Sequence, residues 1–336
     1  MRTHEVGDIK IEYPDELGFV FNPQNIIVTN ATYLRLNILD TYSLKGYYDF
    51  RTSYNGKVMV DISEYLKALF NVGNDQFVGI KNISVKIDTN GGSFVFTMKC
   101  IWGAMNIGEV FNPSRTVVMF RNFPSTISLY SNGNIQTRYD GEAYAPISVD
   151  SGLVHYALNE FFQNANDFGM IKILNTPESP STFQYTFDRT FKPIPDDSVF
   201  IKVIFNDCTK GIYLRWLDRH GFLQYWLFQE GDLTGQSSNE GEQLNVDYSD
   251  VRYVYNGMGR YQGKTYQTTR KACATLVDRD VFNMLSTIFS SPIVDMYIDG
   301  NWIPVNIVAG SFTDSGADLQ DFEIQITMPE TITQML

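Results

Sequence analysis

The sequence predicts a mainly β protein of antiparallel sandwich-like or barrel-like domains, with a few short amphipathic helices. Pairs of Asn or Asp followed by Gly recur along the chain, and these residues tolerate the positive φ angles of tight hairpin turns. Runs rich in β-branched and aromatic residues lie between the pairs and suit pleated sheets. The pairs are Asn55-Gly56, Asn90-Gly91, Asn132-Gly133, Asp140-Gly141, Asn256-Gly257 and Asp299-Gly300. The runs span residues 82–87, 94–102, 115–120, 199–205 and 321–328.

The composition indicates a folded chain that contacts other proteins. Hydrophobic residues make up 43% of the 336 residues and charged residues 19%, which excludes a disordered chain and leaves a surface of neutral polar and aromatic groups. Aromatic residues, at 14%, fit both half-buried sheets and the cores of interfaces. The formal charge of −12, without a local basic stripe, disfavours nucleic acid as a partner.

Three short helices are expected to interrupt the sheets. The first lies near residues 61–71, where the Asp61 carboxylate can cap free backbone amides and Glu64 completes a capping-box-like pair. The second lies near residues 152–164, and the third lies near residues 279–290. Apolar residues at helical spacing give each helix one face for burial. They are Ile62, Tyr65, Leu66, Leu69 and Phe70; Val154, Ala157, Leu158, Phe161 and Phe162; and Phe282, Leu285, Ile288 and Phe289.

The chain is long enough for more than one domain. Pro and small polar residues between 176 and 197 break both ladders and helices, and a weaker seam falls at residues 111–113. We therefore expect an N-terminal β domain over residues 1–110, a middle β segment with a Pro-rich linker over 111–195, and a C-terminal β domain over 196–336. A Val-Asp pair precedes each expected helix, which indicates either a loose internal repeat or the general need of a docked helix for a cap.

Targeting signals and disulfide patterns are absent from the sequence. The first residues lack the apolar core of a signal peptide, and no later segment approaches the roughly 20 apolar residues that span a bilayer. We expect synthesis in the cytoplasm and no membrane partner. Cys100, Cys208 and Cys273 are far apart and odd in number, which favours reduced thiols in a core over a disulfide framework.

No sequence motif indicates catalysis. Residues 256–265 end in Gly-Lys-Thr, but Met258 stands where a phosphate loop needs Gly, and the following residues indicate a strand. The histidines lie outside metal-ligand spacing, no Gly-x-Ser-x-Gly elbow occurs, and no acidic pair stands out as that of a glycosidase. Asp314, Asp318 and Asp321 could gather around Ca²⁺, although they lack the Gly and terminal Glu of the familiar calcium loop. The sequence predicts no enzyme and no cofactor.

The most distinctive segment, residues 211–228, predicts a central hairpin of two aromatic strands around a polar turn at residues 219–221. Neither face of its first strand is fully polar, so both faces should pack against other parts of the protein or against a subunit. A glycan-binding platform of exposed aromatic rings is the alternative function. The candidate interface or packing residues are Tyr213, Arg215, Trp216, Arg219, Tyr225 and Trp226.

At this hairpin the sequence resembles structural proteins of tailed bacteriophages and prophages of the Bacteroidetes group. Residues 213–219, Gly221 and residues 225–228 carry the likeness, with a Tyr-Leu-Arg-Trp-Leu-Asp-Arg strand, a Gly and a Tyr-Trp-Leu-Phe strand. Similar proteins also share motifs that appear here at both ends of the chain. These are Phe21-Asn22-Pro23, the strand and helix of residues 56–70, and Trp302-Ile303-Pro304-Val305.

The resemblance implies a virion part of the tail, baseplate or neck, and more narrowly a ring-forming distal-tail or baseplate protein. Its partners would be copies of itself and other virion proteins, and it would be assembled in the cytoplasm of the bacterial host. Such proteins act by assembly, so the resemblance implies no catalytic residues. Strand edges and neutral aromatic surface would give each subunit its contacts with neighbours.

Overall fold

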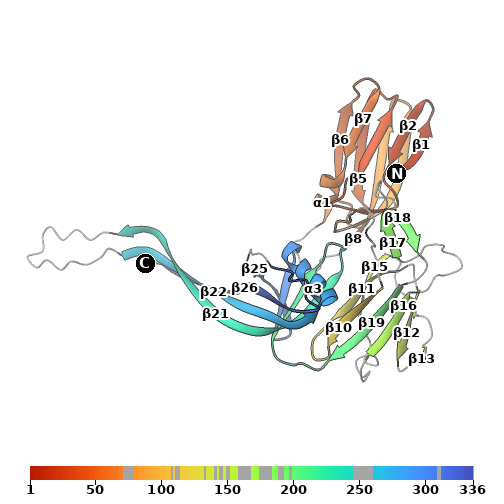
Figure 1. Cartoon of the computed structure of the whole chain (residues 1–336). Coiled ribbons are helices and arrows are strands. Elements are labelled where there is room, and N and C mark those ends of the chain that lie inside the picture. The colour runs from red at the N-terminus through yellow and green to blue at the C-terminus, as the bar shows by residue number, and fades with distance from the viewer. Residues whose placement is uncertain are drawn as a thin grey trace, which may run out of the picture. The chain divides into compact units, whose positions relative to one another are not determined.

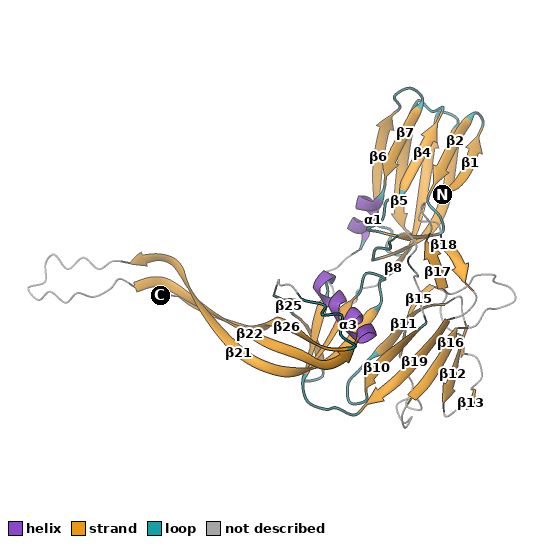
Figure 2. Ribbon diagram, in the orientation of Figure 1, coloured by secondary structure: helices purple, strands orange, loops and turns teal. Residues whose placement is uncertain are grey.

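The structure is a computed structural model that divides into two compact units (Figures 1 and 2). Unit 1 comprises residues 1–208 and 217–224, and unit 2 comprises residues 209–216 and 225–336. Unit 2 therefore begins shortly after the predicted C-terminal boundary, and unit 1 covers the two segments predicted before it. The described residues are 1–70, 79–106, 109, 114–131, 134–139, 142–143, 147–148, 152–157, 168–173, 184–187, 193–196, 199–244, 260–308 and 312–335.

The mainly β, antiparallel fold class is confirmed, beginning with two sheets in the N-terminal part of unit 1. One sheet has the order β1-β2-β4-β7 and the other the order β3-β9-β8-β5-β6, with all pairs antiparallel except β3–β9. The strands of the first sheet are β1 Arg2–Val6, β2 Ile9–Tyr13, β4 Asn25–Thr29 and β7 Lys57–Asp61. Those of the second are β3 Leu17–Phe19, β5 Tyr33–Asp40, β6 Gly46–Thr52, β8 Ile80–Thr89 and β9 Gly92–Ile101.

These two sheets form a β-sandwich, and strands such as β4, β5, β7 and β8 bury every second side chain. In β5, for example, Leu34, Leu36 and Ile38 are fully buried while the residues between them are not. The two sheets also touch where His4 of β1 stacks on Phe94 of β9 at a ring separation of 4.0 Å. Hydrophobic burial between the layers therefore holds this part of the chain together.

Helix α1 (Ser63–Leu69) confirms the first predicted helix and its apolar face. Asp61 Oδ1 accepts hydrogen bonds from the backbone N–H groups of Ser63 and Gln24, at 3.0 and 2.9 Å. The capping-box pair is wrong, because Glu64 instead binds Lys67 at 2.7 Å one turn along the helix. Asp61 thus links the start of α1 to Gln24, the residue before β4, and does not form a capping box with Glu64.

The rest of unit 1 has a mixed sheet in the order β10-β19-β16-β12-β13, with β14 also on β12, and a separate pair β11–β15. Five side chains illustrate the core that joins these layers: Met119, Leu129, Ile135, Ile201 and Val203. The strands are β10 Arg115–Phe120, β11 Thr126–Ser131, β12 Asn134–Tyr139, β13 Glu142–Ala143, β14 Ile147–Ser148, β15 Gly152–Ala157, β16 Phe168–Ile173 and β19 Val199–Asn206.

Two predictions for this middle region are wrong where the structure describes it. Residues 152–157, the predicted start of the second helix, form strand β15 in register with β11, and the remainder of that helix lies outside the described residues. Part of the predicted Pro-rich linker is also a strand, since β18 (Pro193–Asp196) pairs with β17 (Gln184–Phe187). Pairing with a neighbouring strand overrides local sequence preference in both places.

Unit 2 is a curved, barrel-like sheet of seven strands in the order β24-β23-β20-β21-β22-β26-β25 (Figure 1). The two ends of this order are joined by a single residue, Val305, because β24 ends at Pro304 and β25 begins at Asn306. The backbone N–H of Val305 donates to the carbonyl of Val294, which extends the pairing of β23 with β24 by one residue. The strands are β20 Ile212–Leu217, β21 Leu223–Leu244, β22 Arg260–Asp278, β23 Val294–Ile298, β24 Asn301–Pro304, β25 Asn306–Ile307 and β26 Leu319–Met335.

The third predicted helix is confirmed as α3 (Arg279–Ser286) followed by the 3₁₀ turn η1 (Thr287–Ser290). The Asp278 carboxylate caps it by accepting from the backbone N–H of Val281 at 2.8 Å. Phe282, Leu285 and Ile288 of the helix pack on the buried side of the barrel strands. The helix thereby fills the interior that the curved sheet encloses.

Two of the predicted tight turns join paired strands, Asn90-Gly91 between β8 and β9 and Asp299-Gly300 between β23 and β24. Asn55-Gly56 has positive φ angles but leads from β6 to β7, which belong to different sheets. The other three predicted turns lie outside the described residues. Within the described part of the chain, no helix is long and apolar enough to cross a membrane.

Candidate assembly interface

The turn of the predicted hairpin is organised by one carboxylate. Asp218 accepts hydrogen bonds from the backbone N–H groups of His220 and Phe222, at 2.8 and 2.9 Å, and from the side-chain amide of Gln224 at 2.7 Å. Gly221 supplies the positive φ of +79° that the reversal needs. The strands of this hairpin lie in unit 2, whereas the turn, residues 217–224, belongs to unit 1.

One face of the hairpin lies in the core of the barrel. Leu214 and Trp216 are fully buried there, and the Trp216 indole Nε1 donates to the Thr287 hydroxyl at 2.8 Å. Trp226 is partly buried against the same core. Trp216 therefore has no open ring face on which a sugar could stack, and its place in the sequence motif is explained by packing.

The opposite face carries an aromatic cluster from four strands. Tyr213 of β20 is 1% exposed, and its ring lies 6.1 Å from Tyr225 of β21 and 5.6 Å from Trp302 of β24. Arg215 lies over the Trp302 ring, with its guanidinium carbon 4.4 Å from the centroid, and its Nε donates to the Asp295 carboxylate at 2.8 Å. The chain's own side chains thus cover much of this aromatic surface.

Arg219 differs from the other five candidate residues because it lies in the turn. Its guanidinium binds the Glu109 carboxylate, which also lies 2.9 Å from His220 Nε2. Burial opposes the charge on Glu109, but the hydrogen bonds from His220 and from the Asn106 backbone hold the pKa of that carboxyl below its usual value. Arg219 therefore anchors the turn within unit 1.

The sequence did not predict the most prominent feature of unit 2, a long arm formed by the outer parts of β21, β22 and β26 (Figures 1 and 2). β20 has 6 residues and β21 has 22, so β21 continues far beyond its partner on one side. On its other side it pairs with β22 as far as Leu244↔Arg260, and β22 pairs with β26 as far as Gly263↔Met335. We call residues 229–244, 260–270 and 328–335 the arm.

The side chains of β21 and β22 in the arm are largely exposed on both of its faces. Leu233 and Tyr266 lie on the same face, because the register sets Leu233 beside Arg270 and Ser237 beside Tyr266, and they are 53% and 44% exposed. Charges are segregated by strand, with acids on β21 and bases on β22. Within the arm the acids of β21 are Glu230, Asp232, Glu240 and Glu242, and the bases of β22 are Arg260, Lys264 and Arg270.

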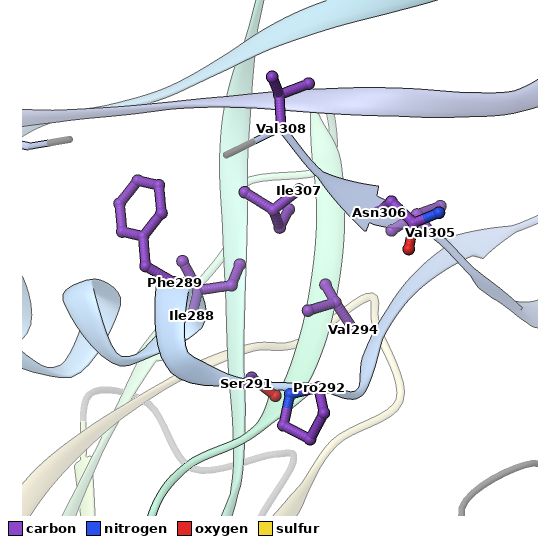
Figure 3. A pocket seen from close by; sticks show the side chains of 9 residues that line it. All are labelled: Ile288, Phe289, Ser291, Pro292, Val294, Val305, Asn306, Ile307 and Val308. Carbon is purple, nitrogen blue, oxygen red and sulfur yellow. The ribbon is translucent and has the colours of Figure 1, made fainter. Parts of the chain in front are cut away.

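A pocket of about 360 Å³ lies beside the junction of β24 and β25. Figure 3 shows Ile288, Val294 and Ile307 pointing into it, with Pro292 at its floor and Phe289 at its side. Its polar side chains are Ser291 and Asn306, and the Ser291 hydroxyl already bonds the backbone of Ile293. The lining offers apolar contact and no acid or base for chemistry.

Groups that could carry chemistry are held in structural contacts where the structure describes them. Ser128 Oγ lies 2.8 Å from His155 Nδ1, but it also accepts from the Leu223 N–H and is 2% exposed, so substrate could not reach it. Lys264 of the phosphate-loop-like sequence lies in strand β22, and the residues that follow it continue this strand, as predicted. Among the described residues no three His, Cys, Asp or Glu side chains gather as metal ligands, and Asp314 instead accepts from Gly316 N–H and the Gln320 amide.

The cysteines only partly follow their prediction as reduced thiols in a core. All three are free, and burial raises the pKa of Cys100, which is fully buried. Cys208 is exposed and Cys273 is half-buried, so these two do not lie in a core. Neither is within reach of a disulfide partner in the described chain.

Known proteins give little further guidance. Neither protein-family models nor curated proteins match the chain. Among solved structures, the fibronectin(III)-like modules of Clostridium thermocellum CbhA are 14% identical, with 59% of this chain and 94% of that chain covered and a TM-score of 0.17. The native conformation of E. coli alpha-2-macroglobulin is 9% identical, with 73% of this chain and 18% of that chain covered and a TM-score of 0.19.

Proposed function

We propose that this protein is a non-enzymatic structural subunit of a bacteriophage tail or baseplate, which assembles through its own surfaces into a ring. The observation that carries the proposal is the arm of unit 2. Strands β21 and β22 of the arm are exposed on both faces, and an isolated ribbon of this kind is at best marginally stable in water. A partner surface that covers the arm would stabilise it.

In the proposed ring the arm of each subunit lies on a different surface of its neighbour. An arm that reaches from one subunit onto a different surface of its neighbour makes a head-to-tail contact, and repetition of that contact closes a ring or extends a filament. Exposed apolar residues on one arm face would supply the buried centre of such a contact, while the acidic and basic strands would fix its register.

The phage assignment is supported by the resemblance of the hairpin and of both chain ends to virion proteins. The strand pattern of Tyr213 to Arg219 and Tyr225 to Phe228 is a packing pattern, and the core position of Trp216 fits that use. Location in the virion and contacts with other virion proteins are parts of the same proposal. Assembly through surfaces needs neither a cofactor nor a catalytic group.

The test is the mass of the full chain by light scattering over a range of concentrations, with negative-stain images of the same fractions. We expect closed rings or short tubes. A double variant, Leu233→Lys with Tyr266→Lys, places two charges on one arm face and should abolish rings and tubes with an unchanged melting temperature. The matched control is Met59→Lys with Tyr54→Lys, two exposed apolar positions of unit 1, which should leave the rings intact. A strict monomer at high concentration, or rings in the arm variant, would contradict the proposal.

A further inference from the structure

Strand β6 is an open sheet edge with unusual side chains. It is the last strand of its sheet, and nothing in the described chain pairs with its outer side. Tyr48 and Phe50 are 77% and 55% exposed on the outer face of the sandwich, where most edge strands carry charge or Pro to discourage pairing. This edge is independent of the arm, which lies in the other unit.

The direction of each backbone group on β6 follows from two hydrogen bonds at its ends. Asp40 N–H donates to the Lys45 carbonyl and Ser53 N–H donates to the Thr32 carbonyl, both at 2.9 Å. Because hydrogen-bonded pairs alternate along an antiparallel ladder, the odd-numbered residues between Lys45 and Ser53 bond to β5. The N–H and C=O groups of Tyr48, Phe50 and Thr52 therefore point away from the sheet.

The hydrogen bond of the Phe50 amide is consistent with this alternation. Its N–H donates to the carboxylate of its own neighbour, Asp49, at 2.8 Å, which is a local bond and not a ladder bond. The same carboxylate accepts from Arg51 Nε at 3.0 Å. Asp49 and Arg51 are thus on the same face of the strand, two residues apart, with Phe50 between them.

The order Asp49-Phe50-Arg51 allows two copies of β6 to pair with opposite charges facing each other. If β6 meets a second β6 antiparallel with Phe50 opposite Phe50, then Asp49 lies opposite Arg51 of the other copy, and Arg51 lies opposite Asp49. Tyr48 then lies opposite Thr52. In this register, the residues whose backbone groups point away from β5 form the hydrogen-bonded pairs between the two copies. Backbone hydrogen bonding and charge pairing therefore favour the same alignment. Moving the two-fold axis by two residues, to Tyr48 opposite Tyr48, would pair Asp49 with Tyr47 and leave Arg51 without its acid.

We propose that β6 is a two-fold contact surface whose partner is β6 of a second copy of this chain. The contact joins two five-stranded sheets edge to edge, with Phe50 on the two-fold axis and two reciprocal Asp49–Arg51 pairs beside it. Tyr48 and Phe50 cover the outer face of the joint. A contact of this symmetry links two subunits, and two rings where the subunits are also in rings.

The first test uses cysteine at the axis. Opposed residues of a hydrogen-bonded antiparallel pair have Cα atoms roughly 5.5 Å apart, which suits a disulfide. In a chain with Cys208→Ser and Cys273→Ser, the Phe50→Cys variant should form a disulfide dimer under mild oxidation, at least about tenfold faster than Tyr42→Cys. Tyr42 is the control because it is 96% exposed and lies outside the strand, so it reports chance collision. Equal rates, or no dimer from Phe50→Cys, would overturn the proposal.

The second test uses charge reversal in the Phe50→Cys chain. Asp49→Arg or Arg51→Glu alone places like charges opposite each other and should slow dimer formation roughly tenfold. The two changes together restore opposite charges in the proposed register and should restore the rate. Failure of the double variant to recover would exclude this register. The arm variant Leu233→Lys with Tyr266→Lys should leave the rate unchanged, so loss of rings and loss of the β6 contact are distinguishable.

Discussion

Asp40 and Lys81 form an ion pair with 2.6 Å between Oδ2 and Nζ, and the Asp40 side chain is 1% exposed. The same carboxylate accepts from the Tyr42 N–H and the Ser43 hydroxyl, so it fixes the loop between β5 and β6. Burial would raise the pKa of Asp40, but the bonds from Lys81, Ser43 and Tyr42 outweigh it and hold that pKa below its ordinary value.

Asp40→Asn should lower the free energy of unfolding by about 2 kcal/mol near pH 7, since it removes the charge from a bonded, buried group. Because the folded-state pKa is depressed, the stabilisation is present above the unfolded-state pKa and is lost as the pH falls through the folded-state pKa. Urea unfolding of both proteins at neutral and at acidic pH measures this. The difference should shrink in acid, and Asp8→Asn, at an exposed position, should show no such difference. A difference that is constant with pH would contradict the assignment.

Asp218→Ala should destabilise the protein by roughly 2–4 kcal/mol, because two backbone N–H groups and the Gln224 amide lose their acceptor at a buried turn. Urea unfolding, followed by fluorescence, reports the change. Asp207→Ala is the matched control, since that side chain is 82% exposed in its pair with Arg121 and such pairs contribute about 0–1 kcal/mol. Similar losses in both variants would mean that the turn does not depend on Asp218.

The strands and two helices could be predicted because their signals are local. In β8 and β9 alternating apolar residues match the buried face, and α1 and α3 each begin beside an Asp and bury one apolar stripe. The second helix was not predictable in the same way. Val154 and Ala157 suit a helical face, yet Gly152–Ala157 is held as a strand by its pairing with β11. The periodicity of a short segment does not show which strand or helix it packs against, because that depends on the tertiary structure.

The arm escaped prediction for a related physical reason. Residues 229–244 are rich in Gly, Ser, Gln and acids, and such residues have weak strand preference. Their strand form depends on a distant partner with the opposite charge, as in the Glu230–Arg270 pair. The hairpin residues were found from their aromatic pattern, but the sequence could not separate Trp216, in the core, from Tyr225, nearer the surface. The alternation of side chains shows which residues share a face of a strand, but it does not show what packs against that face.

Trp216→Ala should destabilise the protein by roughly 3–5 kcal/mol, because it opens a large cavity in the barrel and leaves the Thr287 hydroxyl without the indole N–H. Thermal and urea unfolding measure the effect. Tyr54→Ala removes an aromatic ring that is 83% exposed and should change stability by no more than about 0.5 kcal/mol. If Trp216→Ala were equally mild, the barrel core would not depend on this residue, and the packing explanation of the hairpin would fail.

Glycan binding by the hairpin would need an aromatic ring with one open face. Trp216 has none, and the Arg215 guanidinium lies over Trp302 on the outer face. We therefore expect a broad glycan panel to leave tryptophan fluorescence unchanged. Arg215→Ala uncovers the Trp302 ring and is the variant in which weak sugar stacking could first appear. A saturable change with the unaltered protein, abolished by Trp302→Ala at an unchanged melting temperature, would contradict the packing role of this face and favour glycan recognition.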